Sequence, residues 1–489
     1  MICYGLMSIG LVLATVILLS LAYGFGIGSN GKIVQNGRVY TGTLPTGASV
    51  YVNDQLQGNK TNTSLLFEAG RYTLRYEKDG YRSWQHSMVI NGGVNVRYDY
   101  ALLVPTQLQP ESIKTFDGQV TFASQSQDKR WLLVQSRGGL NEFLRYDLKD
   151  PKSLPVVLEV PDSILTQPSQ TQQWTAASWA DDNRHVLLTR SFTATGQNPA
   201  SGQEQILYDV SQPDEPQNLT TLLDAAGKTI ELRNDKYDSY YIFDQSAHTL
   251  TSATLDNPEP APLLQNVAAY KSYGNSRLLY VDVPEEAADV AMVHEFDGKT
   301  TYDFGSIQVS DTYLLNFTQH KDNWYVAFGA RAESRVAVYK NPIASLQQLP
   351  NQPLVPVQVL KVTSPVTLEF SANARFLMAN GGQEFYVYDV DDDRGYQFTA
   401  EQPIDTSLPV SWMDGYRITE VSSGRLTIFD YDNTNLMSLQ AVDPTLPVFF
   451  SPDMKYVYSF VLSSGSAAET GTIAGSVLQR TALRIPADM

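Results

Sequence analysis

This sequence contains little cysteine or histidine, and it has fewer basic than acidic residues. The only cysteine is Cys3, so the chain cannot form an internal disulfide framework or a cysteine-based zinc site. Five histidines leave little material for a multi-histidine metal centre. Acidic residues outnumber basic ones by 52 to 35, which gives a formal net charge of −17. A nucleic-acid-binding protein is therefore not expected, because contacts to phosphates need a basic surface.

Apolar, aromatic and turn-forming residues are plentiful. Hydrophobic residues make up 43% of the 489 positions, which is enough for a substantial core and argues against wholesale disorder. The length predicts at least two domains. The chain has 28 tyrosines, 32 glycines and 25 prolines, a composition that favours strands joined by tight turns. We therefore expect an all-β protein beyond its N-terminal segment.

The first 31 residues carry no charged side chain. The run Leu6–Ala22 is almost purely apolar, and extended to Ile27 it covers 22 residues, about 33 Å of helix. This predicts an uncleaved, single-pass transmembrane anchor over residues 1–28, with a cleaved signal peptide ending at Ala22 as the alternative. Lys32 and Arg38 follow the run rather than precede it, which is contrary to the usual orientation. We still expect the bulk of the chain to be extracytoplasmic.

Two nucleotide-binding patterns overlap just after this run. Residues 26–31 fit G-x-G-x-x-G, and residues 26–32 fit G-x-x-x-x-G-K. Both patterns need a strand before and a helix after, so that backbone N–H groups face a phosphate. An apolar segment precedes and a strand-like run follows, and Ile33 stands where the second pattern needs Ser or Thr. Residues 29–37 are therefore predicted to be a linker.

Residues 38–104 alternate between apolar and polar side chains over short runs. The alternation is clearest in residues 72–76 and 94–98, and turn-forming sequences at 53–54, 78–80 and 91–93 separate the runs. A β-sandwich of about 70 residues follows from this pattern.

The same segment resembles a PEGA domain. The resemblance rests on Pro45-Thr46-Gly47-Ala48, Val50-Tyr51-Val52-Asn53-Asp54, Ala69-Gly70-Arg71-Tyr72 and Lys78-Asp79-Gly80-Tyr81. Thr46 departs from the family pattern, which has glutamate at this position. The resemblance implies an extracytoplasmic module of a cell-envelope protein without catalytic residues.

Residues 105–489 repeat a local pattern in which a polar turn precedes a basic residue and an apolar strand. The recurring positions are Arg130, Arg184, Tyr237, Arg277, Asn323, Arg375, Arg417 and Lys455. Their mean spacing is about 46 residues, a period typical of β-propeller blades. Several of the following strands end in an aromatic residue and aspartate, as at 146–147 and 388–389. We predict a propeller of seven or eight blades, and closure of one blade by strands from both ends of the chain is one reason that both counts stay open.

The sharpest copy of the repeat is the run from Phe450 to Lys455, Phe-Ser-Pro-Asp-Met-Lys. It resembles the Ser-Pro-Asp-Gly-Lys turn of WD-repeat-like propellers, with Met454 in place of the usual glycine. The copies contain no Trp-Asp dipeptide, so the subfamily stays open. Trp174 and Trp179 could form a ligand platform, but core positions on inner strands are the favoured interpretation.

No catalytic motif emerges from the sequence. H-E-x-x-H and G-x-S-x-G are absent, the histidines are far apart, and no helix–strand alternation remains for a hydrolase domain. Residues 389–395 have acids at the first, third and fifth positions of a calcium loop, but Arg394 and Ala400 replace the required Gly and Glu. A solvated hairpin tip is predicted there instead. No catalytic, cofactor-binding or metal-binding residue is assigned.

We therefore expect a non-enzymatic, membrane-anchored envelope protein in which the propeller over residues 105–489 binds a protein or glycan partner. Two alternatives stay open. One is an envelope enzyme that acts on a wall polymer with carboxylates in the propeller channel. The other is an accessory propeller for transport or secretion, which rests on fold analogy alone.

Overall fold

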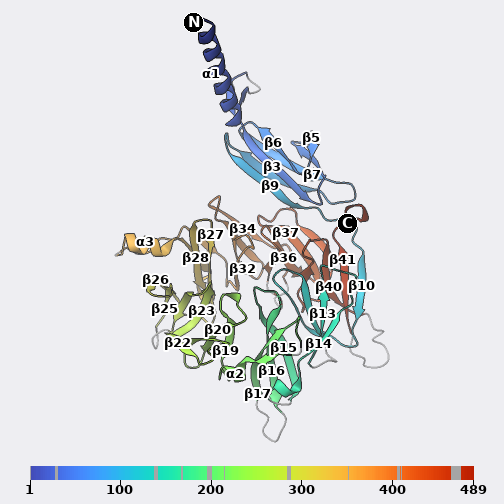
Figure 1. Cartoon of the computed structure of the whole chain (residues 1–489), viewed down its shortest axis with the longest axis vertical. Helices are drawn as coiled ribbons and strands as arrows, with labels where there is room; N and C mark the ends of the chain where they lie inside the picture. Colours follow the sequence, from blue (N-terminus) through green and yellow to red (C-terminus); the bar gives the residue numbers. More distant parts are fainter. Residues whose placement is uncertain are drawn as a thin grey trace. The chain divides into compact units, whose positions relative to one another are not determined.

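The computed structural model describes residues 2–27, 31–136, 141–166, 169–194, 201–213, 215–283, 288–350, 352–404, 408, 410–463 and 475–489. It divides into two compact units (Figure 1). The first comprises residues 1–109 together with 482–489, and the second comprises residues 110–481. The last eight residues of the chain thus belong to the unit that contains the small β domain.

The N-terminal apolar run forms helix α1 (Ile2–Ala22). Among the described residues, no helix is both long enough and apolar enough to cross a membrane. The transmembrane anchor predicted over residues 1–28 is therefore not supported. A short hairpin of β1 (Phe25–Ile27) and β2 (Ile33–Gln35) follows, so a strand occupies the start of the glycine-rich pattern at 26–31.

The small domain consists of two sheets. One has the strand order β6-β3-β9 and the other β5-β4-β7-β8. The strands are β3 (Gly37–Leu44), β4 (Ser49–Val52), β5 (Gln55–Lys60), β6 (Thr63–Phe67), β7 (Gly70–Glu77), β8 (Trp84–Ile90) and β9 (Asn95–Leu102). Val39, Leu74 and Tyr76 are fully buried, and the Tyr76 hydroxyl donates to Tyr98 O at 2.7 Å, which links the two sheets. The alternation in the sequence therefore predicted the buried face correctly.

Residues 110–481 form eight four-stranded antiparallel sheets among the described residues. Blade 1 is β11 (Val120–Gln125), β12 (Trp131–Ser136), β13 (Glu142–Asp147) and β14 (Val156–Glu159). Blade 2 is β15 (Ser169–Trp179), β16 (His185–Ala194), β17 (Ser201–Asp209) and β18 (Gln217–Asn218). Blade 3 is β19 (Thr229–Leu232), β20 (Ser239–Asp244), β21 (Thr249–Thr254) and β22 (Ala261–Gln265). Blade 4 is β23 (Val267–Tyr273), β24 (Arg277–Asp282), β25 (Val290–Phe296) and β26 (Thr301–Gln308).

The second half of the unit continues the same pattern. Blade 5 is β27 (Tyr313–His320), β28 (Asn323–Ala330), β29 (Arg335–Lys340) and β30 (Gln358–Lys361). Blade 6 is β31 (Thr367–Phe370), β32 (Phe376–Gly381), β33 (Glu384–Asp389) and β34 (Arg394–Thr399). Blade 7 is β35 (Ser411–Trp412), β36 (Arg417–Ser422), β37 (Arg425–Asp430) and β38 (Met437–Ala441). Blade 8 is β39 (Phe449–Phe450), β40 (Tyr456–Leu462), β41 (Ser476–Ala482) and β10 (Pro110–Thr115). Short helices α2 (Leu219–Leu222) and α3 (Pro342–Gln348) lie between strands, as do 3-10 turns at Asp162–Ile164, Arg233–Asp235 and Arg331–Glu333, and a fourth, Pro486–Asp488, lies in the C-terminal segment.

Strands from opposite ends of this unit close blade 8. Strand β10 pairs antiparallel with β41, with Pro110 opposite Thr481. A core cluster that includes Leu132 and Phe460 joins blade 8 to blade 1, and similar clusters or direct contacts join the other neighbouring blades. Figure 1 shows the sheets following one another around a ring. A closed ring of four-stranded sheets is a β-propeller. The sequence left seven or eight blades open, and the described residues form eight.

Candidate functional site

The recurring polar turn is held by hydrogen bonds within the turn and to the strand that follows it. In the turn before β12, Ser126 Oγ donates to Asp128 Oδ1 at 2.6 Å, and the Trp131 N–H donates back to Ser126 Oγ at 2.9 Å. Ser451 and Asp453 repeat this arrangement before β40. Met454 has a φ of 55°, so it takes the left-handed conformation for which related turns use glycine.

In blades 1, 2 and 6 the basic residue of the repeat pairs with an aspartate that ends the third strand of its blade. Arg130 contacts Asp147 at 2.8 Å, and Arg375 contacts Asp389 at 2.6 Å. Arg184 and Asp209 form the same pair in blade 2. The aromatic-aspartate strand endings noted in the sequence therefore hold the second and third strands together.

The acidic hairpin at residues 389–393 forms ion pairs with basic side chains of the protein. Asp389 is fully buried against Arg375, which also contacts Asp392 at 3.0 Å. Asp391 contacts Lys321 at 2.6 Å. Among the described residues no group of three or more metal-ligating side chains could hold an ion. The hairpin-tip interpretation fits this geometry better than the calcium loop.

Turns of different blades also contact one another. The Asp128 N–H donates to Asn183 Oδ1 at 2.8 Å, which joins the turns of blades 1 and 2. Lys129 Nζ donates to Met413 O at 2.7 Å, which joins blade 1 to blade 7 across blade 8. Burial lowers the pKa of Lys129, since the charged form loses its hydration. Through these hydrogen bonds the turn residues link different blades of the ring.

Three carboxyl groups have strongly raised pKa values. Burial raises the pKa of Glu295, Glu369 and Glu420 to about 7 in each case. They belong to blades 4, 6 and 7. Glu295 is paired with Arg277 at 3.1 Å, which partly offsets the effect of burial on its pKa.

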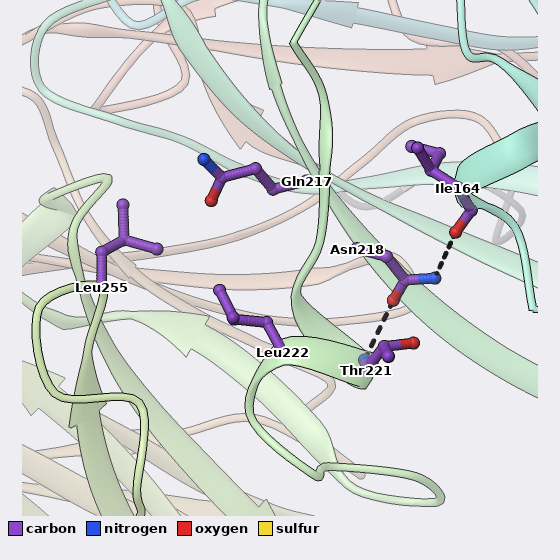
Figure 2. A pocket seen from close by; sticks show the side chains of 6 residues that line it. All are labelled: Ile164, Gln217, Asn218, Thr221, Leu222 and Leu255. Carbon is purple, nitrogen blue, oxygen red and sulfur yellow. Dashed lines mark hydrogen bonds between the residues drawn. The ribbon is translucent and has the colours of Figure 1, made fainter.

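A pocket of about 560 Å³ lies beside the last strand of blade 2. Its lining consists of Ile164, Gln217, Asn218, Thr221, Leu222 and Leu255 (Figure 2). Ile164 comes from the connection between blades 1 and 2, and Leu255 follows the third strand of blade 3. The lining thus combines three blades and contains no titratable side chain.

Asn218 fixes the shape of this pocket. Its Nδ2 donates to Ile164 O at 2.9 Å, and its Oδ1 accepts from the Thr221 N–H at 3.1 Å (Figure 2). The same Nδ2 also donates to Glu204 Oε2 at 2.8 Å. The bond from the Thr221 N–H caps helix α2. All the hydrogen-bonding groups of this amide are therefore engaged within the protein.

Asn218 is hydrogen-bonded to a buried ion pair. Arg190 and Glu204 contact each other, and each side chain is only 1% exposed. Glu204 Oε2 also accepts from Thr166, through both the backbone N–H and the hydroxyl. Such a pair is stable only when its remaining polar atoms are satisfied. The network makes the pocket rigid, but it supplies no acid, base or nucleophile to a ligand.

Sequence patterns did not predict this pocket. A capping asparagine before Leu219 was its one readable signal, because the lining residues come from segments far apart in the chain. Trp174 and Trp179 are 0% and 5% exposed and belong to the core between blades 1 and 2, so the prediction that they are core residues is confirmed.

One domain of the chain matches a known protein family. Residues 37–105 match the PEGA domain family. No curated protein matches the chain. Among solved structures, a eukaryotic initiation factor has a TM-score of 0.40 at 10% identity, covering 69% of this chain and 93% of that one. Oligogalacturonate lyase in complex with manganese has 0.38 at 12%, covering 77% and 98%. Hsv2 of Kluyveromyces lactis has 0.36 at 13%, covering 75% and 100%. Residues 37–105 are therefore a PEGA domain, and a β-propeller follows it in the same chain.

Proposed function

We propose that this protein is a non-enzymatic, extracytoplasmic binding protein whose propeller holds a protein partner at the Asn218 pocket. The lining of that pocket carries the proposal. Ile164, Leu222 and Leu255 offer apolar surface, Leu222 is 44% exposed, and the exposed polar groups are the Gln217 amide and the Thr221 hydroxyl. Rigid apolar pockets with a few oriented polar groups are typical binding sites.

The composition of the lining favours a protein over a glycan as the partner. Sugar rings present C–H faces that stack on aromatic side chains, and hydroxyl groups that favour charged partners. The six lining residues include neither an aromatic nor a charged side chain. A leucine-rich wall with one amide and one hydroxyl suits an apolar side chain and its neighbouring peptide group. The net charge of −17 adds long-range attraction only for a cationic partner.

A photo-cross-linking amino acid at position 217 in the full chain tests this binding site in the native cell. We expect a protein adduct that is lost when Leu222→Asp is added, because a carboxylate would enter the apolar wall. Position 203, exposed on β17 of the same blade, is the matched control site. Equal adducts at positions 217 and 203, or none at either, would contradict the proposal.

The extracytoplasmic location is proposed from two features, the PEGA domain and the apolar N-terminal run. The PEGA resemblance implies an envelope module, and the uncharged segment 1–31 suits export. Protease added to intact cells, after opening of any outer membrane, should digest residues 32–489. Protection of the chain until the cells are lysed would place it in the cytoplasm and overturn this part of the proposal.

A further inference from the structure

The three-stranded sheet of the PEGA domain has one buried and one open face. On β3, Val39 and Thr41 are buried, whereas Tyr40 between them is only partly buried. On β9, Tyr98 is buried, whereas Arg97 and Asp99 are accessible, with side chains 64% and 28% exposed. Because side chains alternate along a strand, Tyr40, Arg97 and Asp99 share the open face.

The open face contains a hollow beside Asp99. A Cβ atom at position 42 would lie 2.8 Å from Asp99 Cβ and 2.9 Å from Asp99 Cα, so no larger residue fits without displacing β9. Glycine at this position therefore lets Asp99 of β9 pack closely against β3. A pocket of about 500 Å³ lies here, and its walls include Tyr40, Leu44, Asn62, Ser64, Arg97 and Asp99.

The polar groups around the hollow include both hydrogen-bond donors and acceptors. Arg97 and Asp99 form an ion pair, which leaves the wall nearly neutral as a whole. The Arg97 guanidinium also lies 5.2 Å from the centroid of the Tyr40 ring. Asn62 Oδ1 accepts from the Thr43 N–H at 3.2 Å, so among the described residues its NH₂ is the group left for a ligand. Ser64 adds an exposed hydroxyl on the neighbouring strand β6.

Apolar surface lies beside these polar groups. Tyr40 forms one wall, and Leu44, 39% exposed, forms another. A ligand with hydroxyl groups at its edge and C–H groups on its faces matches both parts of the site. A free anion matches poorly, because Asp99 already neutralises Arg97 and the chain as a whole carries a charge of −17.

We propose that this hollow is a binding site for a neutral carbohydrate. Asp99 accepts hydrogen bonds from vicinal sugar hydroxyls, Arg97 and the Asn62 NH₂ donate to them, and Tyr40 and Leu44 contact the C–H face of the ring. The site lies in the PEGA domain and is independent of the partner proposed for the propeller.

Affinity electrophoresis of the full chain tests the proposal. The native gels contain hydroxyethyl cellulose, a galactomannan, glycol chitin, the polyanion alginate or no polymer. The variants are Asp99→Asn, which removes the carboxylate acceptor at constant size, and Tyr40→Leu, which removes the ring. Asp54→Asn is the matched control, because Asp54 pairs with Arg75, which lies 4.4 Å from the Tyr51 ring, and none of these three residues lines the hollow.

We expect at least one neutral polymer to retard the wild type and Asp54→Asn equally. Asp99→Asn and Tyr40→Leu should each weaken the apparent affinity roughly tenfold, the loss of one charged hydrogen bond or one ring contact. Unchanged unfolding temperatures establish that both variants are folded, and Ser64→Ala offers a milder change if one is not. Retardation by alginate alone, no retardation by any neutral polymer, or equal retardation of wild type and folded Asp99→Asn would overturn the proposal.

Discussion

The Tyr81 hydroxyl donates to Asp488 Oδ2 at 2.8 Å and accepts from the Ile485 N–H at 2.9 Å. Lys78 adds an ion pair to Asp488 Oδ1 at 2.9 Å. Tyr81 and Lys78 belong to the Lys-x-Gly-Tyr turn on which the PEGA resemblance partly rests. In this chain the turn therefore holds residues 482–489 against the small domain. Burial raises the pKa of Tyr81 to about 12, so the hydroxyl stays protonated at neutral pH.

Removing the Tyr81 hydroxyl should release the C-terminal residues. Tyr81→Phe loses two hydrogen bonds, at a cost of about 1–2 kcal/mol, while the 7% exposed ring keeps its packing. Local opening should then expose the Arg484–Ile485 bond, and trypsin should remove the last five residues about tenfold faster. Tyr72→Phe is the control, because that hydroxyl donates to Glu68 O within the same domain. Equal cleavage rates in the two variants would show that Tyr81 does not hold the tail.

The ion pairs within blades should differ in strength according to burial. Asp389→Asn should lower the free energy of unfolding of the propeller by about 3 kcal/mol. The substitution removes the fully buried carboxylate that pairs with Arg375, and it leaves that guanidinium only its contacts to Asp391 and Asp392. Asp311→Asn should cost less than about 0.5 kcal/mol, because Asp311 and Arg331 are 3.6 Å apart with side chains 75% and 40% exposed. Urea unfolding followed by tryptophan fluorescence measures both. Similar losses would mean that the blade pairs contribute no more than surface pairs.

Glu420 should make the propeller less stable as pH rises. Burial raises its pKa to about 7 from an ordinary 4.5, so the folded protein retains a proton that the unfolded chain has released between these values. The stability contributed by this proton is fully present below pH ~4.5 and is lost as pH rises through 7. Glu420→Gln is neutral at every pH and should exceed the wild type at pH ~8 by at most about 3 kcal/mol, with no advantage at pH ~4.

Thermal unfolding at the two pH values measures this effect. Glu142→Gln, at an exposed position on β13, serves as the control and should leave the pH dependence unchanged. A pH profile of Glu420→Gln that is parallel to the wild-type profile would rule out a raised pKa at Glu420.

Asn218 should stabilise blade 2 as well as the pocket. Asn218→Ala removes two donors, one of them to the buried Glu204, together with the cap of α2. We expect a loss of about 2 kcal/mol. Hydrogen exchange of the amides of β17 and β18 should then accelerate by more than about tenfold. Gln217→Ala, an exposed change in the same pocket lining, should leave exchange unaltered, and equal protection in both variants would contradict the role given to Asn218.

Local signals predicted most of the architecture. Alternating side chains marked the strands of the PEGA domain, and each of the eight recurring residues lies at the start of the second strand of a blade or within two residues before it. Such signals are readable because they depend on backbone period and on short-range hydrogen bonds, such as Ser126 to Asp128. The polar-turn motif also predicted where the charges would lie, although their pairing with the strand-ending aspartates became visible only in the folded blade.

The sequence by itself determined an all-β chain with a PEGA domain, a repeated blade and no catalytic motif. Tertiary structure decided what depends on distant segments: the closure of blade 8 by β10 and β41, the place of residues 482–489 beside Tyr81, and both pockets. It also failed to support the anchor predicted from hydropathy alone. The physical reason is that a strand pattern specifies which face is buried but not which partner covers it, so pairings between opposite ends of the chain emerge only from packing.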